Sequence, residues 1–145
     1  MRWVDPLGLL FIFDKSDKKL HWIEDDPGWE SPPTISWNAT TGPFGNPLPI
    51  GWYYLTGEET PAASESNSMT DTCGNKYKFR LHPQFPTSST GLLIHPDGGE
   101  PGTEGCIGVQ GCTKSLRDFI NFYLNKPNGR GNPDKDRKLP VYVRD

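Results

Sequence analysis

The sequence predicts a mainly β domain with one substantial helix, and three observations support this prediction. Its 145 residues include 16 glycines and 15 prolines, and turn residues at this frequency favour short strands over long helices. Several short apolar or alternating runs are bounded by these turn residues, which is typical of strands. One segment near the C-terminus has apolar residues at helical spacing instead. The length suits one domain with a single core.

The N-terminal part is expected to form a hairpin and two further strands. Apolar runs at residues 9–13 and 19–23 flank a polar turn, which is the hairpin pattern. Within the second run, His21 is expected to face solvent. Aromatic and β-branched residues predict strands at 35–38 and 52–56, joined by a loop rich in glycine and proline.

A polar segment and another strand follow in the middle of the chain. Residues 57–75 are rich in Glu, Thr, Ser and Asn and poor in apolar side chains. They predict a mobile surface loop, with a lid over a cleft as the alternative. Residues 77–82 alternate between apolar and polar, which predicts a strand with Arg80 and His82 on its polar face.

The C-terminal part predicts the helix and a closing strand. Thr113 is placed to cap a helix that runs to about residue 124. Apolar residues recur at i, i+3, i+4 and i+7, so one helix face is expected to pack on the sheet. These residues are Leu116, Phe119, Ile120 and Tyr123. A charged loop at 126–138 and a strand at 139–143 are expected to complete the domain.

Composition argues against several classes of function. The net charge is −3 and the chain has no basic run, so nothing indicates nucleic-acid binding. No apolar stretch approaches the roughly 20 residues of a membrane span, and the N-terminus has no signal-peptide pattern. If the protein works outside its own cytoplasm, another component is expected to carry it there. No Cys-x-x-Cys pair or histidine cluster indicates a metal site, and no cofactor is expected.

Residues 91–111 carry the candidate chemistry. An apolar run ends at His95, a loop rich in Gly, Pro and acidic residues follows, and Cys106 opens the next apolar run. Two adjacent strand ends can bring an imidazole within hydrogen-bonding reach of a thiol, as nucleophilic cysteine catalysis requires. Gly105 has no Cβ, so a substrate carbonyl can approach the backbone there. Backbone N–H groups beside the cysteine can then form an oxyanion hole.

Simpler interpretations stand beside this one. Free cysteine is often just buried, and a lone histidine near a loop is usually a polar surface residue. His82 is the main alternative to His95 as the catalytic base. Arg80 is a candidate ligand for a substrate carboxylate, with an exposed structural arginine as the alternative.

The three cysteines, Cys73, Cys106 and Cys112, allow one disulfide and one thiol. A Cys73–Cys112 bridge would leave Cys106 able to react. A Cys106–Cys112 bridge would block it. The sequence leaves both pairings open.

The residues around the cysteine resemble the active-site segment of the YkuD-type L,D-transpeptidases. In that family a strand ends in His-Gly and a later Ser/Thr-His-Gly-Cys carries the nucleophile. Thr103, Gly105 and Cys106 match this pattern, whereas Glu104 replaces the second histidine. The Glu variant resembles a branch found among antibacterial type VI secretion effectors. The resemblance implies a sandwich of short strands with one helix, with Thr103 and Glu104 at the substrate. Because Glu104 replaces the second histidine, a backbone carbonyl is expected to orient His95 instead.

A second element resembles the same effector branch. Its pattern is Trp-x-Ala-x-(Ser/Thr)-Gly, then Asn and Pro-(Leu/Ile)-Pro-x-Gly-x-Tyr. The matching residues are Trp37, Ala39, Thr41, Gly42, Asn46, Pro47, Pro49, Gly51 and Tyr53. Trp37 and Tyr53 are therefore candidates for substrate binding, with aromatic core residues as the alternative.

The first ten residues resemble the end of an Rhs-repeat core. Residues 5–9 read Asp-Pro-Leu-Gly-Leu, which also predicts a turn on its own chemistry. In Rhs proteins this sequence ends the conserved cage and precedes a variable C-terminal toxin. The resemblance implies that residues 1–10 end an Rhs core and that residues 11–145 are a catalytic toxin domain.

The two resemblances together imply peptidoglycan chemistry by a secreted effector. Cys106 would attack the carbonyl that joins meso-diaminopimelate to the terminal D-alanine of a tetrapeptide stem. The implied partners are those stems, a cognate immunity protein and the Rhs cage of the parent chain, and the implied location is the periplasm of target bacteria. The alternatives are a papain-like or NlpC-type cysteine peptidase or amidase, and a non-catalytic wall-binding module.

Overall fold

The computed structural model describes residues 10–23, 35–41, 48–97, 106–125 and 138–145. These residues form eight strands, one α-helix and one short 3-10 helix. The elements are β1 (Leu10–Asp14), β2 (Lys19–Ile23), β3 (Ile35–Thr40), β4 (Gly51–Glu59), η1 (Ala63–Glu65), β5 (Lys78–Pro83), β6 (Leu93–Pro96), β7 (Ile107–Val109), α1 (Lys114–Leu124) and β8 (Leu139–Arg144). The predicted mainly β fold with one helix is confirmed.

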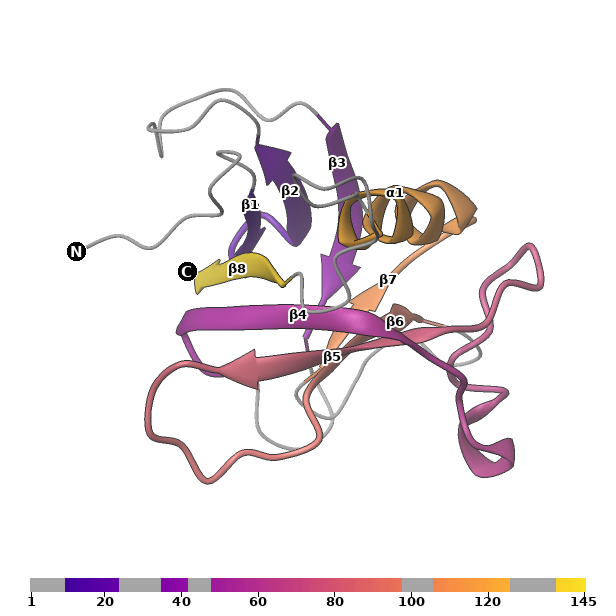
Figure 1. The fold of residues 1–145 in the computed structure, drawn as a ribbon. Coiled ribbons are helices and arrows are strands. Elements are labelled where there is room, and N and C mark those ends of the chain that lie inside the picture. The colour runs from indigo at the N-terminus through magenta and orange to yellow at the C-terminus, as the bar shows by residue number, and fades with distance from the viewer. Residues whose placement is uncertain (1–9, 24–34, 42–47, 98–105, 126–137) are drawn as a thin grey trace, which may run out of the picture.

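The strands of the described residues close into one barrel in the order β1-β2-β3-β7-β6-β5-β4-β8 (Figure 1). Six of the neighbouring pairs are antiparallel, whereas β1–β8 and β6–β7 are parallel. The sandwich expected from the sequence thus takes the form of a continuous sheet. Strands that are far apart in the sequence, such as β3 and β7, become neighbours in this way.

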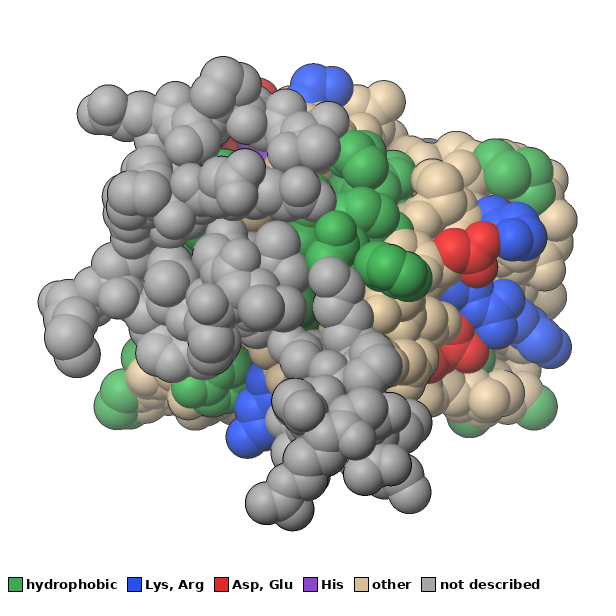
Figure 2. Space-filling view, turned by 45° about the horizontal axis from the view of Figure 1, so that its top comes forward, with side chains coloured by type: hydrophobic (Ala, Val, Ile, Leu, Met, Phe, Trp, Pro, Cys, Tyr) green, Lys and Arg blue, Asp and Glu red, His purple; other side chains and the backbone are tan. Residues whose placement is uncertain are grey.

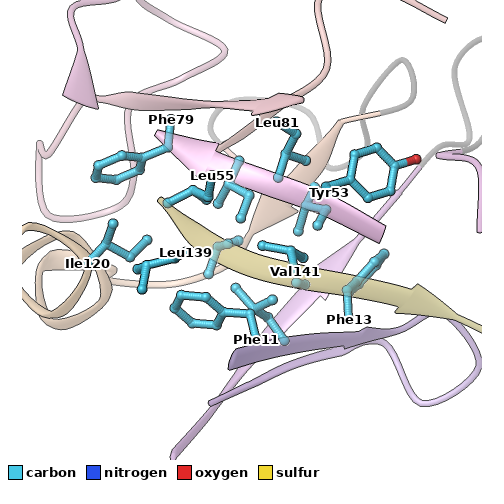
Figure 3. Close-up of a cluster of buried hydrophobic side chains, with 14 of the residues drawn as sticks. Phe11, Phe13, Tyr53, Leu55, Phe79, Leu81, Ile120, Leu139 and Val141 are labelled. Carbon is cyan, nitrogen blue, oxygen red and sulfur yellow. The ribbon is translucent and has the colours of Figure 1, made fainter. Parts of the chain in front are cut away.

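The hydrophobic core fills the inside of the barrel (Figure 3). Alternate residues of each strand point inward, because successive side chains of a strand face opposite sides. In β1, Phe11 and Phe13 belong to this core, whereas Leu10 and Ile12 belong to a second, smaller apolar cluster. In β5, the predicted alternation is confirmed, since Phe79 and Leu81 are buried in the core.

The helix packs its apolar stripe into the same core, as predicted. Leu116, Ile120 and Leu124 are buried, and Phe119 and Tyr123 pack against them from the rim. Thr113 is the N-cap residue, but its side chain makes no capping hydrogen bond. Its hydroxyl instead donates to Asp71 and accepts from Tyr77, so its role is tertiary rather than local.

The predicted surface loop at residues 57–75 is exposed over much of its length, but it is more ordered than its composition predicts. It begins inside β4 and contains η1, and Met69 and Asp71 are buried. The Cys73–Cys112 disulfide then ties it to the start of α1, with 5.3 Å between the two Cα atoms. The polar composition predicts a mobile loop, but a disulfide and the hydrogen bonds of Asp71 to distant residues hold the segment in place.

His21 is also buried, so the prediction that it faces solvent is wrong. It lies opposite Ser36 in the β2–β3 pair. Its Nδ1 lies 2.6 Å from Ser36 Oγ, and its Nε2 lies 3.0 Å from Asp17 Oδ2. Neighbours on both sides cover the ring and satisfy its two nitrogens.

The surface of the described residues shows no membrane-spanning helix and mixed charges. No helix among these residues is long and apolar enough to cross a bilayer. Figure 2 shows blue and red side chains interspersed over one part of a face, and green apolar side chains next to the grey region.

Candidate active site

Strands β6 and β7 place the predicted histidine and cysteine on one face of the sheet. The two strands are parallel, with Ile94 opposite Ile107 and His95 opposite Gly108. Directly opposed residues of a parallel pair share a face, and Ile94 and Ile107 are both in the core. His95 and Cys106 therefore both lie on the outer face, on neighbouring strands. They are offset by two residues, or about 7 Å along the strand.

A backbone carbonyl orients His95, as expected from the replacement of the second histidine by Glu104. The Nδ1 atom lies 2.6 Å from the carbonyl oxygen of Pro96. A carbonyl only accepts hydrogen bonds, so Nδ1 carries the proton and Nε2 has the lone pair. The ring is buried, with 6% of its surface exposed. Nε2 is therefore the atom that can take a proton from a thiol.

Burial lowers the pKa of His95 below its ordinary value, because a charged imidazolium is poorly solvated there. The Pro96 carbonyl and the Asp97 and Glu65 carboxylates act in the opposite direction without cancelling this effect. The imidazole is thus neutral at neutral pH. This state is suited to a general base, not to a permanent ion pair.

Cys106 keeps its thiol because the disulfide joins the other two cysteines. This settles the pairing that the sequence left open. The side chain is partly exposed, and its Sγ donates weakly to the Gly91 carbonyl at 3.7 Å. Gly91 has a φ of 66°, and a Cβ built there would meet nothing within 4 Å. The thiol thus points toward the open space beside Gly91, just before β6.

Arg80 lies on the same outer face, on the strand beyond β6. It is opposite Leu93 in the β5–β6 pair. Its Nε and Nη2 each lie 3.0 Å from a different oxygen of the Glu59 carboxylate, which makes a bidentate pair. Next to it, Lys78 pairs with Glu65 at 2.9 Å.

His82, the alternative base, lies two strands away from the thiol strand β7, whereas His95 lies on the neighbouring strand. It is on β5, and β6 separates β5 from β7. Its Nε2 lies 2.9 Å from the Thr56 hydroxyl on β4, on the side away from β7. The geometry favours His95 as the base.

Trp37 and Tyr53 are not beside the thiol. Tyr53 is fully buried in the core, and its hydroxyl donates to the Pro49 carbonyl at 2.5 Å. Trp37 packs against the core from the rim, and its Nε1 donates to Ser115 Oγ at 3.3 Å. Their positions match the core interpretation of these aromatic residues, not substrate binding.

Three of the predicted site residues, Thr103, Glu104 and Gly105, lie outside the described residues. Sequence reasoning missed two others, Gly91 and Glu59. Gly91 contributes a backbone carbonyl and the absence of a side chain, and the only signal was its place before an apolar run. No group of three or more His, Cys, Asp or Glu side chains suited to a metal occurs within the described ranges.

Comparison with protein families shows to which family this chain belongs. The family model of the YkuD L,D-transpeptidase catalytic domain matches residues 9–140. The chain belongs to this family. Comparison with curated protein sequences gives no match.

Several solved structures, among them L,D-transpeptidases, share the fold. Bd1075 of Bdellovibrio bacteriovorus is 18% identical, with a TM-score of 0.59 over 95% of this chain and 48% of its own. L,D-transpeptidase 1 of Mycobacterium tuberculosis is 14% identical, with a TM-score of 0.53 over 94% and 61%. An L,D-transpeptidase of Mycobacterium smegmatis is 14% identical, with a TM-score of 0.51 over 95% and 59%. The L,D-transpeptidase-like chain thus spans less than two thirds of each neighbour.

Proposed function

We propose that this L,D-transpeptidase domain is an antibacterial effector toxin that acts on peptidoglycan stems through a Cys106 thioester. The observation that carries the proposal is the shared outer face of His95 and Cys106, with Nδ1 bonded to Pro96 so that Nε2 can act as base. Membership of the L,D-transpeptidase catalytic domain family supports the substrate class.

The first half-reaction forms the thioester. His95 Nε2 takes the thiol proton as Sγ attacks the carbonyl before the terminal D-alanine of a tetrapeptide stem. When the tetrahedral intermediate collapses, the same nitrogen returns the proton to the leaving amine and the C–N bond breaks. Backbone N–H groups beside the cysteine, including that of Gly105, are proposed to hold the oxyanion.

The second half-reaction resolves the thioester in one of two ways that suit a toxin. Water yields a tripeptide stem, which is L,D-carboxypeptidase activity, and a free D-amino acid yields an exchanged stem. His95 takes a proton from the incoming nucleophile as the new bond forms at the carbonyl, and returns it to the Cys106 sulfur as the C–S bond breaks. Both outcomes consume the donor stems that crosslinking needs.

The effector context rests on the sequence resemblances at residues 1–10 and 103–106. In this proposal, residues 1–10 are the end of an Rhs core and residues 11–145 are the toxin. A cognate immunity protein is the proposed partner, and the proposed site of action is the periplasm of target bacteria. Thr103 and Glu104 are proposed substrate contacts.

Mass analysis of muropeptides treated with the purified protein tests the reaction. We expect tetrapeptides to lose one alanine, and to exchange it when free D-amino acids are added, while pentapeptides and glycan strands stay intact. Cleavage between sugar and peptide would instead indicate an amidase. Cleavage at a D-glutamyl bond would indicate an NlpC-type peptidase.

A further inference from the structure

A row of side chains crosses the outer face from β5 to β7. Arg80 lies opposite Leu93 on β6, and Ile94 lies opposite Ile107 on β7, so Cys106 lies beside Leu93. Residues 80, 93 and 106 therefore share the outer face. Neighbouring strands are about 4.8 Å apart, which puts the β5 and β7 backbones about 10 Å from one another.

The residues just before β6, next to the thiol, offer space for a ligand. Leu93 is buried, but the preceding glycine, Gly91, has open space above it. Cys106 already leans this way, because its Sγ contacts the Gly91 carbonyl. The backbone bond from Leu81 N to Leu92 O, at 2.8 Å, continues the β5–β6 pairing and keeps Gly91 against β5.

The guanidinium of Arg80 is held ready for an anion. Glu59 accepts hydrogen bonds from Nε and Nη2 of Arg80. Nη1 makes no hydrogen bond to any residue that the structure describes. The Glu59 hydrogen bond raises the pKa of Arg80, and the charges of Glu59, Glu65 and Cys106 add to this, against the effect of burial. Arg80 is thus within electrostatic reach of Cys106. Because the guanidinium is already held in place, its side chain loses little conformational entropy when it binds a carboxylate.

We propose that Arg80, oriented by Glu59, binds the free carboxylate of the residue that Cys106 releases, and that this residue lies over Gly91. The inference rests on the proposed function. In a peptide, consecutive Cα atoms are about 3.8 Å apart, so the terminal carboxylate lies about one residue length from the attacked carbonyl. One residue of the peptide together with an extended arginine side chain is long enough to cross the roughly 10 Å between the β7 and β5 backbones. Arg80 then determines specificity for stems that end one residue after the scissile bond.

The test compares a tetrapeptide that ends in a carboxylate with the same peptide ending in a carboxamide. We expect the wild-type protein to prefer the carboxylate by roughly 10- to 100-fold in kcat/KM, the size of a charge-assisted pair. Arg80→Gln should lose this preference, mainly through a higher KM for the carboxylate peptide, with the carboxamide peptide unaffected. Arg80→Lys should keep part of the preference, and Glu59→Gln should weaken it.

Two further variants separate this role from a structural one. Arg117→Gln removes the other bidentate arginine–glutamate pair, with Glu58, and should leave the preference unchanged. Gly91→Asn puts a side chain into the open space at a left-handed position that Asn tolerates, and should raise KM for both peptides. Alkylation of the Cys106 thiol by iodoacetamide should remain as fast as in the wild type in the Arg117→Gln control.

The outcomes distinguish this proposal from the proposed function. A preference that survives Arg80→Gln, or an equal loss for both peptides, overturns the carboxylate contact. Equal conversion of both peptides by the wild type does the same and leaves the reaction itself standing. Conversion of neither peptide by the wild type overturns the proposed function and this proposal with it.

Discussion

At the scale of single residues, the proposed chemistry requires one thiol and one imidazole with a fixed tautomer. Cys106→Ala should reduce tetrapeptide conversion by roughly 1,000-fold or more, and His95→Ala by roughly 100- to 10,000-fold. His82→Ala is the matched control and should cost only a few-fold, because β6 separates His82 from the thiol strand. Single-turnover release of alanine measures all three. An equal loss in the His82 variant would transfer the base role to it.

The pH profile of the same reaction follows from the burial of His95. A base works only when neutral, and burial lowers its pKa. The acid limb of kcat/KM should therefore lie below pH 6.5, the ordinary value of histidine. A limb above pH 6.5 would mean that another group, or a stable ion pair with the thiolate, controls the reaction.

Sequence order was enough to predict that His95 and Cys106 lie at neighbouring strand ends, but not the faces on which aromatic residues lie. The motif around Trp37 and Tyr53 predicts substrate-binding aromatic residues, whereas both side chains pack in or against the core. The direction of a strand side chain depends on how the sheet closes, which is a long-range property. The carbonyls of Pro96 and Gly91 left no sequence signal, because every residue has a carbonyl.

At the scale of elements, Asp71 joins the segment after β4 to the start of α1. Its Oδ2 accepts from Thr113 N and Oγ1, each at 2.7 Å, and its Oδ1 accepts from Cys73 N and Asn75 N, each at 2.9 Å. Burial opposes the charge, but these hydrogen bonds prevail and lower the pKa of Asp71 to about 2. The folded state thus favours the ionised carboxylate.

Asp71→Asn should therefore cost about 2 kcal/mol of unfolding free energy at neutral pH. Because the pKa is lowered on folding, this stabilisation is complete above about pH 4 and is lost as the pH falls toward 2. Urea unfolding at pH 7 and at pH 2.5 measures both values. Asp118→Asn removes an exposed partner of Lys114 and should change little. A difference between wild type and Asp71→Asn that stays constant down to pH 2.5 would contradict this reasoning.

Most elements were predictable because their periodicity is local. The hairpin, the alternating strand before residue 83, the helix stripe and the closing strand all follow from spacing along the chain. The segment at 57–75 was not predictable in this way. Its anchors, the disulfide and Asp71, bond to residues about forty positions away, and composition carries no trace of such contacts.

At the scale of the whole molecule, the barrel brings the two ends of the described chain together. β8 inserts between β1 and β4, parallel to β1. This pairing and the parallel β6–β7 pair join strands that no short turn connects, so local patterns could not reveal them. The family resemblance predicted the fold class because it includes those long-range pairings. Barrel closure itself had to come from the structure.

The proposed effector role predicts that toxicity depends on the compartment in which the protein is present. Peptidoglycan stems lie outside the cytoplasm, and the Cys73–Cys112 disulfide is of a kind that persists in oxidising compartments. We expect expression in the bacterial cytoplasm to be harmless, and expression behind a secretory signal to be lethal, with Cys106→Ala as the inactive control. Viable counts after induction measure both, and a co-expressed periplasmic immunity protein should restore growth. Equal killing from the cytoplasm would mean that the target is not the cell wall.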